Sequence, residues 1–223
     1  WVSGESIVNQ LPQYGELGVS NPENMPGPRD NHKTWSDAQG DIWIFGGYGI
    51  DAAGETGYLN DLWKFDVVTS EWTWIGGNDL IDQYGVFGPI DEYNSTNYPG
   101  ARAAGIQWTG ADGLIWFFGG QGIDKFGISV GYLNDLWSYD PTANQWAWHS
   151  GSDFAGSTGS YNETGLSSVD YVPGARWHST GWVDENDNLF LYGGFKSNQI
   201  STGLYNDFWK YTPSTNNWSR AAD

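Results

Sequence analysis

The sequence contains no cysteine, and basic residues are scarce. Of the 223 residues, 9 are Lys or Arg and 27 are Asp or Glu, which gives a formal net charge of −18. A chain without cysteine holds no disulfide framework, thiol nucleophile or cysteine-ligated zinc. Its negative charge repels nucleic acid and anionic membranes, so we expect it to bind neither. No apolar run approaches the roughly 18 residues that a membrane-spanning helix needs.

What the chain does contain is a unit of about 73 residues that occurs three times. Arg29, Arg102 and Arg176 are 73 and 74 residues apart, and 14 of the 15 Trp residues occupy repeated positions, Trp177 being the exception. Glycine doublets recur at the same interval, at Gly46-Gly47, Gly119-Gly120 and Gly193-Gly194. Repetition of this kind is typical of stacked supersecondary units.

The aromatic spacing within each unit predicts four short strands. Trp35 and Trp43 are 8 residues apart, and Trp63 and Trp72 are 9 apart, about the length of a strand, a tight turn and a returning strand. The second strand, such as residues 114–118, is apolar at successive positions, so we expect both of its faces to be buried. We also expect the glycine doublet to end this strand. Helical periodicity is nearly absent.

A sheet whose second strand is buried on both faces must pack between copies of itself, and radial stacking of such sheets gives a β-propeller. The motifs resemble the kelch repeat: the glycine doublet, then Asn-Asp-Leu-Trp, then Tyr-Asp-Pro-Thr-Ala-Asn-Gln-Trp at 139–146, with Pro-Gly-Ala-Arg at 99–102 and 173–176. The resemblance covers essentially the whole chain. It implies an all-β, kelch-type β-propeller with four-stranded antiparallel blades, although this unit is longer than a kelch repeat of about 50 residues.

The repeat predicts three blades at residues 29–77, 102–151 and 176–223, joined by connections at 78–101 and 152–175. The last Trp of each unit and the next Arg are 28 residues apart in every copy, and this constant spacing predicts an ordered excursion. The connection from the glycine doublet to Asn-Asp varies between 12 and 14 residues. We interpret that shorter connection as the candidate recognition loop.

The ring is expected to be incomplete. Trp1 occupies the position of a last strand, so residues 1–28 are interpreted as the connection from a missing preceding blade. Propellers close with about 4 to 8 blades, and three blades leave two apolar faces. We expect a segment of a longer protein with a six- or seven-bladed ring, a proteolytic product, or a protomer that completes its ring with another chain. The expected partner is therefore a protein or further blades.

The repeated charged residues are the candidate binding residues of the channel or rim: Arg29, Arg102, Arg176, Asp61, Asp135 and Asp207. Three arginines that enter the inner strands would form part of a basic ring for an anionic ligand. A residue present in every blade usually does the same structural job in each, however. An Arg–Asp pair that bridges strands or blades would satisfy both charges, and we favour this interpretation.

No catalytic or metal site is predicted. His32 and His178 fall on first strands and His149 follows a last strand, so we interpret them as ordinary strand or rim residues. Asp51 and Asp124 lie in acidic or glycine-rich loops that suit Ca²⁺, but no recognised calcium loop is present. We expect no cofactor, with Ca²⁺ as the alternative. The Tyr–Cys copper cofactor of some kelch-like oxidases is excluded because the chain has no Cys.

The function that we predict is a non-enzymatic interaction or structural module at the cell surface or outside the cell. Few lysines, many Asn, Gly, Ser and Thr residues and a low isoelectric point favour that location. Three Asn-x-Ser/Thr sequons occur, at Asn94, Asn162 and Asn217, but chance sequons are expected in a chain this rich in Asn, so they support glycosylation only for a secreting eukaryotic source. The alternative is a carbohydrate-binding or carbohydrate-active propeller whose active site lies largely outside this segment. Kelch-like enzymes act on sugars, and the 38 aromatic residues would offer stacking platforms, although most of them occupy repeated positions.

Overall fold

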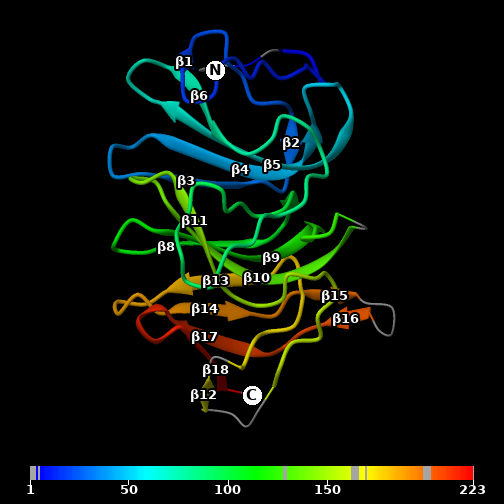
Figure 1. Cartoon of the computed structure of the whole chain (residues 1–223), viewed down its shortest axis with the longest axis vertical. Coiled ribbons are helices and arrows are strands. Elements are labelled where there is room, and N and C mark those ends of the chain that lie inside the picture. The colour runs from blue at the N-terminus through cyan, green and yellow to red at the C-terminus, as the bar shows by residue number, and fades with distance from the viewer. Residues whose placement is uncertain are drawn as a thin grey trace.

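The computed structural model describes residues 4, 6–127, 130–161, 166–168, 170–197 and 202–222. Over these residues the chain folds into three large antiparallel sheets that stack face to face in chain order (Figure 1). We name them blades 1, 2 and 3. The two termini lie at opposite ends of the stack, so the outer faces of blades 1 and 3 point away from each other (Figure 1). Trp1 lies outside the described residues.

The strands follow the same order in each blade, from the inner strand outward. Blade 1 contains β2 (Arg29–Asp30), β3 (Lys33–Ser36), β4 (Ile42–Ile50), β5 (Thr56–Asp66), β6 (Glu71–Gly76) and β1 (Ser20–Asn21). Blade 2 contains β7 (Arg102–Ala103), β8 (Ile106–Thr109), β9 (Ile115–Ile123), β10 (Val130–Asp140) and β11 (Gln145–Ser150). Blade 3 contains β13 (Thr180–Val183), β14 (Leu189–Tyr192), β17 (Phe208–Thr212), β18 (Asn217–Ala222) and β12 (Ser167–Ser168). A separate hairpin of β15 (Phe195–Ser197) and β16 (Thr202–Leu204) and a short 3-10 helix, η1 (Pro213–Thr215), complete blade 3.

The inner strand is broken two residues after each repeated Arg. Asn31, Ala104 and His178 adopt left-handed conformations there, with φ of 52°, 55° and 52°. At this break the blades are joined by their backbones: the Ala104 amide donates to the Asn31 carbonyl and the His178 amide to the Ala104 carbonyl, each at 2.9 Å. The left-handed residue thus turns an amide of one inner strand toward the preceding blade.

The glycine doublet does not end the second strand in blades 1 and 2, so that prediction was wrong there. β4 and β9 continue through it with a register shift, and only β14 stops before its doublet. The doublet is instead where the next blade approaches. Gly119 has φ +63°, and a Cβ on it would lie 2.8 Å from the Arg176 carbonyl oxygen; Gly46 meets the Arg102 carbonyl oxygen in the same way at 2.7 Å.

The predicted recognition loop is mostly a β-hairpin. In blade 1 the β4–β5 ladder extends as far as the Ile50–Thr56 pair, which leaves only residues 51–55 as the tip. In blade 2 the ladder reaches the Ile123–Val130 pair. In blades 1 and 2 the loop is therefore reduced to a short tip at the end of a paired β-hairpin.

The described part of each connection pairs with the outer edge of the blade that follows it. Ser20 pairs with Thr73, Asn94 forms a bridge with Trp146, and Ser168 pairs with Trp218. The connection therefore adds a further strand or bridge outside the four strands that the sequence predicted. Figure 1 shows β1 beside β6 and β12 beside β18.

The core lies between the blades and repeats its geometry. We call the interface between blades 1 and 2 the first joint and that between blades 2 and 3 the second joint. Phe45 packs against Trp146 across the first joint with ring centroids 5.1 Å apart. The equivalent Phe118 packs against Trp218 across the second joint with ring centroids 5.4 Å apart. In β9 residues 115–118 are all buried, which confirms the prediction for the middle blade. The end blades each leave one face open, because Ile42 is 42% exposed and Tyr192 is 47% exposed.

We predict that Gly119→Ala destabilises the protein much more than Gly113→Ala. Both glycines have positive φ, which costs a residue with a side chain about 1–2 kcal/mol. At Gly113 no atom lies within 4 Å of the added Cβ, whereas at Gly119 two carbonyl oxygens lie 2.8 Å away. Urea unfolding measures both losses. Equal losses would show that the second joint tolerates a methyl group at the doublet.

Candidate functional site

Each blade contains a buried Arg–Asp pair made from the repeated residues. In blade 2, Nη1 of Arg102 donates to Oδ1 of Asp135 at 2.8 Å and Nη2 donates to Oδ2 at 2.7 Å, so the contact is bidentate. The pairs Arg29–Asp61 and Arg176–Asp207 have the same form, each with a shortest distance of 2.6 Å. All six predicted residues are thus brought together in pairs, each within one blade.

The pair also binds backbone and indole groups around it. Arg102 donates to the carbonyls of Gly100 at 2.9 Å and Gly119 at 3.3 Å, and Trp137 Nε1 donates to Asp135 at 2.7 Å. The guanidinium and carboxylate therefore connect the inner strand, the glycine doublet and the third strand. This explains why Arg, Gly, Asp and Trp recur together in the repeat.

An aromatic residue from the connection covers each pair, and the sequence analysis missed it. Tyr14 donates to Oδ2 of Asp61 at 2.7 Å, and Tyr161 donates to Oδ2 of Asp207 at 3.1 Å. Phe87 stands at the same repeat position and packs against Trp137 with ring centroids 4.8 Å apart. Their spacing of 73 and 74 residues was the signal that would have found them.

The charges of the pairs are neutralised within the blades. No side chain of the three pairs is more than 9% exposed. Burial opposes ionisation of Asp207, but hydrogen bonds from Arg176 and its charge outweigh this and hold the pKa of Asp207 below its usual value. Likewise burial opposes the charge of Arg29, and Asp61 outweighs it and raises the pKa of the guanidinium. This arrangement favours the structural interpretation; anion binding by these residues stays a prediction.

The two aspartates considered for calcium accept hydrogen bonds from backbone amides. Asp51 accepts from the amides of residues 53, 55 and 81, and Asp124 accepts from those of residues 126, 127 and 155. Each carboxylate thereby fixes a hairpin tip to the connection that follows the blade. Calcium binding there stays a prediction; among the described residues no group of three or more His, Asp or Glu side chains is placed to hold a metal ion.

His149 is part of a polar network that occurs only in blade 2. Its Nδ1 lies 2.6 Å from Oδ1 of Asp91, and its Nε2 lies 2.7 Å from Oγ of Ser138, which in turn lies 2.5 Å from the Tyr93 hydroxyl. Asn216 of blade 3 donates to the other oxygen of Asp91. Blades 1 and 3 have Lys64 and Lys210 where blade 2 has Ser138. Ser138 is fully buried, whereas the Asp91 side chain is 47% exposed, and the network fastens the connection to blades 2 and 3.

The other two histidines lie apart from His149. His32 lines a groove over the outer face of blade 1, and its Nδ1 is buried and has no hydrogen-bond partner among the described residues. His178 is exposed at the break in the inner strand. Of the sequon residues, Asn94 is exposed and Asn217 is half-buried, while Asn162 lies outside the described residues.

The hairpin tip of blade 2 and the connections on either side of that blade carry exposed aromatic side chains that the repeat does not explain. Phe126 and Phe154 stack with ring centroids 4.9 Å apart and are 49% and 56% exposed. Tyr84, 58% exposed, lies beside them, against Gly127. Lys125 pairs with Asp153 at 2.8 Å next to the two rings. We call Tyr84, Phe126 and Phe154 the loop-end patch.

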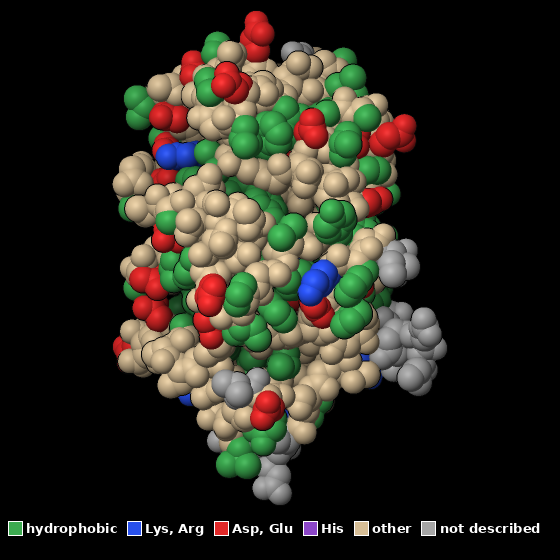
Figure 2. Space-filling model, in the orientation of Figure 1, with side chains coloured by type: hydrophobic (Ala, Val, Ile, Leu, Met, Phe, Trp, Pro, Cys, Tyr) green, Lys and Arg blue, Asp and Glu red, His purple; other side chains and the backbone are tan. Residues whose placement is uncertain are grey.

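Polar and acidic side chains cover much of the remaining surface. On the side of the stack in Figure 2, acidic side chains are spread over the blades and basic ones are few. No helix within the described ranges is long and apolar enough to cross a membrane.

The stacked antiparallel blades, with their paired Arg and Asp, define a β-propeller fold. The model of the KLHDC2/KLHL20/DRC7 Kelch-repeats domain matches residues 19–222, so the chain belongs to the kelch-repeat family. Domains of this family generally mediate protein–protein interactions. No curated protein matches the chain. A solved structure described as that of YjhT is similar, with a TM-score of 0.56 and 16% identity over 89% of this chain, which spans 54% of that structure.

We predict that Asp135→Ala lowers the free energy of unfolding by about 3–5 kcal/mol, because it leaves the Arg102 guanidinium buried without its partner. Asp153→Ala is the control, since it breaks the more exposed pair with Lys125 and should cost no more than about 1 kcal/mol. Both values come from chemical denaturation. Similar losses in the two variants would refute the structural role of the buried pair.

We predict that His149 makes the fold less stable in acid. Burial lowers the pKa of His149, and Asp91 only partly opposes this. Below the unfolded-state pKa of about 6.5 the unfolded chain therefore binds a proton that the folded chain does not, so the free energy of unfolding falls as the pH drops. His149→Gln should flatten the curve of stability against pH between about 6.5 and 5, and the two curves should run parallel above about 7.5. Identical slopes below 6.5 would exclude this role.

Proposed function

We propose that this chain is a non-enzymatic protein-binding module that uses the loop-end patch to contact its partner. The observation that carries the proposal is the exposure of two stacked Phe rings at positions where blade 1 has Ala53 and Leu80. Aromatic side chains are enriched among the residues that dominate the binding energy of protein interfaces. Blade 1 folds without aromatic residues at these two positions, so the repeat itself does not account for Phe126 and Phe154. Membership of the kelch-repeat family supports the same role.

The geometry of the patch suits recognition. The hairpin tip that bears Phe126 is held by Asp124, which accepts amides from the tip and from Ala155. The backbone amide of Lys125 also donates to the Asp153 carbonyl at 3.1 Å, so the two Phe-bearing segments are fixed side by side. A preordered apolar surface loses little entropy when it binds, which favours affinity.

A second candidate ligand is a carbohydrate, because stacked exposed rings also offer a platform for the apolar face of a sugar. Exposed aromatic rings suit a protein ligand and a sugar ligand alike. Both proposals therefore predict that the same substitutions in the patch weaken binding, and they differ only in the ligand that is bound.

We propose in addition that the protein works at the cell surface or outside the cell. The low content of Lys and Arg and the strongly acidic composition support this location. Surface biotinylation of intact source cells tests it, and labelling only after lysis would refute it.

We predict that the double variant Phe126→Ser/Phe154→Ser loses binding to the natural partner by at least about tenfold. Truncation of an aromatic anchor typically costs more than about 1 kcal/mol, and 1.4 kcal/mol corresponds to tenfold in affinity. The control is Val68→Ser, since Val68 is 89% exposed in the turn between β5 and β6. Partners are captured from the source with the wild type and identified, and each Kd is then measured by surface plasmon resonance.

A glycan array probed with the same three proteins separates the candidates. Sugar binding that the double variant loses, without a protein partner, would favour the carbohydrate ligand. Unchanged binding of every ligand by the double variant would overturn the role of the patch.

A further inference from the structure

We infer, on the basis of the function proposed for the loop-end patch, that its protein partner presents a basic segment in which Lys or Arg stands beside apolar side chains. Three features of the molecule point to this partner. An ammonium group of the chain itself already lies against the patch, the surface around the patch is rich in carboxylates, and a second apolar surface of the chain lacks them.

A lysine of the chain already occupies part of the patch. Nζ of Lys125 lies 2.8 Å from Oδ2 of Asp153 and 5.9 Å from the ring centroid of Phe126. A carboxylate attracts an ammonium ion, and so does an aromatic ring whose centroid lies within about 6 Å. The Lys125 side chain is 41% exposed and the Asp153 side chain is 21% exposed, so a partner can reach both. The patch is therefore built from groups that hold a cation.

Lys125 uses only part of this attraction. Among the described residues, Lys125 is the one side chain that binds the Asp153 carboxylate, and it engages one of the two oxygens. A guanidinium ion can bind a carboxylate through both oxygens. The rings of Phe154 and Tyr84 are 56% and 58% exposed, and no cation of the described chain lies over them. One carboxylate oxygen and two exposed rings thus remain available to a second cation, supplied by a partner.

The surface around the patch carries an excess of negative charge. Backbone hydrogen bonds join four segments into this surface, at residues 51–56, 79–86, 121–127 and 152–158. Six of their residues are acidic and one is basic, a local formal charge of −5: Asp51, Glu55, Asp79, Asp82, Asp124 and Asp153 against Lys125. Such a surface attracts basic partners and repels acidic ones, over a Debye length of about 8 Å at physiological salt.

The chain itself leaves most of this charge uncompensated. Asp124 accepts hydrogen bonds from three backbone amides, and Asp82 accepts one from the Tyr58 amide at 2.9 Å. An amide stabilises a carboxylate but brings no positive charge. In the described part of the chain, Asp153 is the only one of the six acidic residues that forms an ion pair. A basic partner therefore gains attraction from carboxylates that no lysine or arginine of the chain has neutralised.

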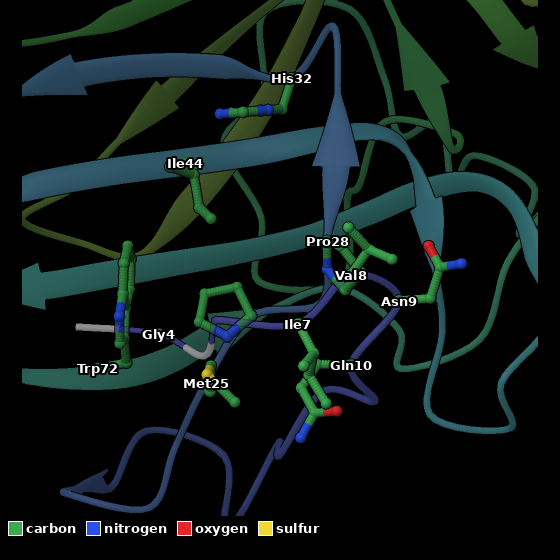
Figure 3. A pocket seen from close by; sticks show the side chains of 11 residues that line it. Gly4, Ile7, Val8, Asn9, Gln10, Met25, Pro28, His32, Ile44 and Trp72 are labelled. Carbon is green, nitrogen blue, oxygen red and sulfur yellow. The ribbon is translucent and has the colours of Figure 1, made fainter. Parts of the chain in front are cut away.

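The apolar groove over the outer face of blade 1 differs from the patch in this respect. Apolar side chains form much of its lining, among them Ile7, Val8, Ile44 and Trp72 (Figure 3). No Asp or Glu is found among the described residues that line it. The combination of exposed apolar rings with carboxylates therefore distinguishes the loop-end patch, and the groove offers a matched control surface.

The first test selects ligands from a displayed library of random twelve-residue peptides. The library is passed over the double variant Phe126→Ser/Phe154→Ser, which has the charge of the wild type and removes peptides held by charge alone, and is then selected on the wild type. We expect the selected peptides to have a net positive charge, with Lys or Arg next to apolar residues. The control Ile7→Ser/Val8→Ser should bind the same peptides.

The outcomes of this selection separate the chemistry of the partner from the role of the patch. Selected peptides of neutral or negative net charge would overturn the basic partner and leave the patch as a binding site. If no peptide prefers the wild type to Phe126→Ser/Phe154→Ser, the function proposed for the patch is wrong as well.

The second test measures the binding kinetics of a selected peptide by surface plasmon resonance, with the peptide immobilised. Asp79→Asn/Asp82→Asn removes two charges near the patch and keeps an oxygen that accepts from the Tyr58 amide. It should slow association at least about threefold, because electrostatic steering acts mainly on the association rate. Glu23→Gln/Glu185→Gln removes two exposed charges elsewhere and should change the rate less than about twofold, since screening limits their range.

Lys125→Gln tests the sign of the partner's charge. A basic partner competes with Lys125 for Asp153 and for the Phe126 ring, so we expect this variant to bind the selected peptide at least about twofold more tightly. An acidic partner would instead lose its one cation on this surface. Weaker binding by Lys125→Gln, or an association rate that does not fall between about 0.05 and 0.5 M salt, would overturn the basic partner.

Discussion

The buried bidentate contact between Arg and Asp is the interaction on which the rest of each blade depends. Two charges removed from water are costly, and the cost is offset only when every polar atom is satisfied. In blade 2 the carbonyls of Gly100 and Gly119 and the indole of Trp137 supply the missing partners. Those groups lie just before the inner strand, in the second strand and in the third strand, so satisfying one guanidinium fixes where these three segments meet. The outer strand and the connection then pack on a sheet whose register is already set.

The joint between blades depends on the absence of side chains as much as on their presence. Aromatic rings fill most of the interface, while at Gly46 and Gly119 the missing side chain leaves room for the backbone carbonyl of the next blade. A network around His149 then adds contacts that only one joint possesses. The repeat thus supplies the same joint each time, while single residues make one joint differ from another.

The architecture could be predicted from the sequence because its causes are local and repeated three times. The spacing of Arg102 and Gly119 recurs without change in the other units, that from Gly119 to Asp135 changes by only one or two residues, and the alternation of turn and strand recurs as well. The sequence did not predict that β4 and β9 continue through the glycine doublet, because glycine usually interrupts a strand. The glycines are explained by the carbonyl oxygens of Arg102 and Arg176, which approach the doublet from the next blade. The loop-end patch and the partners of His149 were also beyond the sequence, because Phe126 and Phe154, or Asp91 and Ser138, are distant along the chain and follow no repeat.

The pairing of each connection with the blade that follows it has a consequence for how this protein can be cut and recombined. The folding unit starts at the outer strand, near Ser20, Asn94 or Ser167, and not at the Arg that begins the inner strand. A cut placed just before Arg102 removes the outer edge bridge from blade 2 and leaves that segment attached to a sheet it does not pair with. Duplications, deletions or grafts whose boundaries lie before these outer-edge segments would transfer each sheet intact. The structural unit for engineering therefore begins earlier in the chain than the repeat that is visible in the sequence.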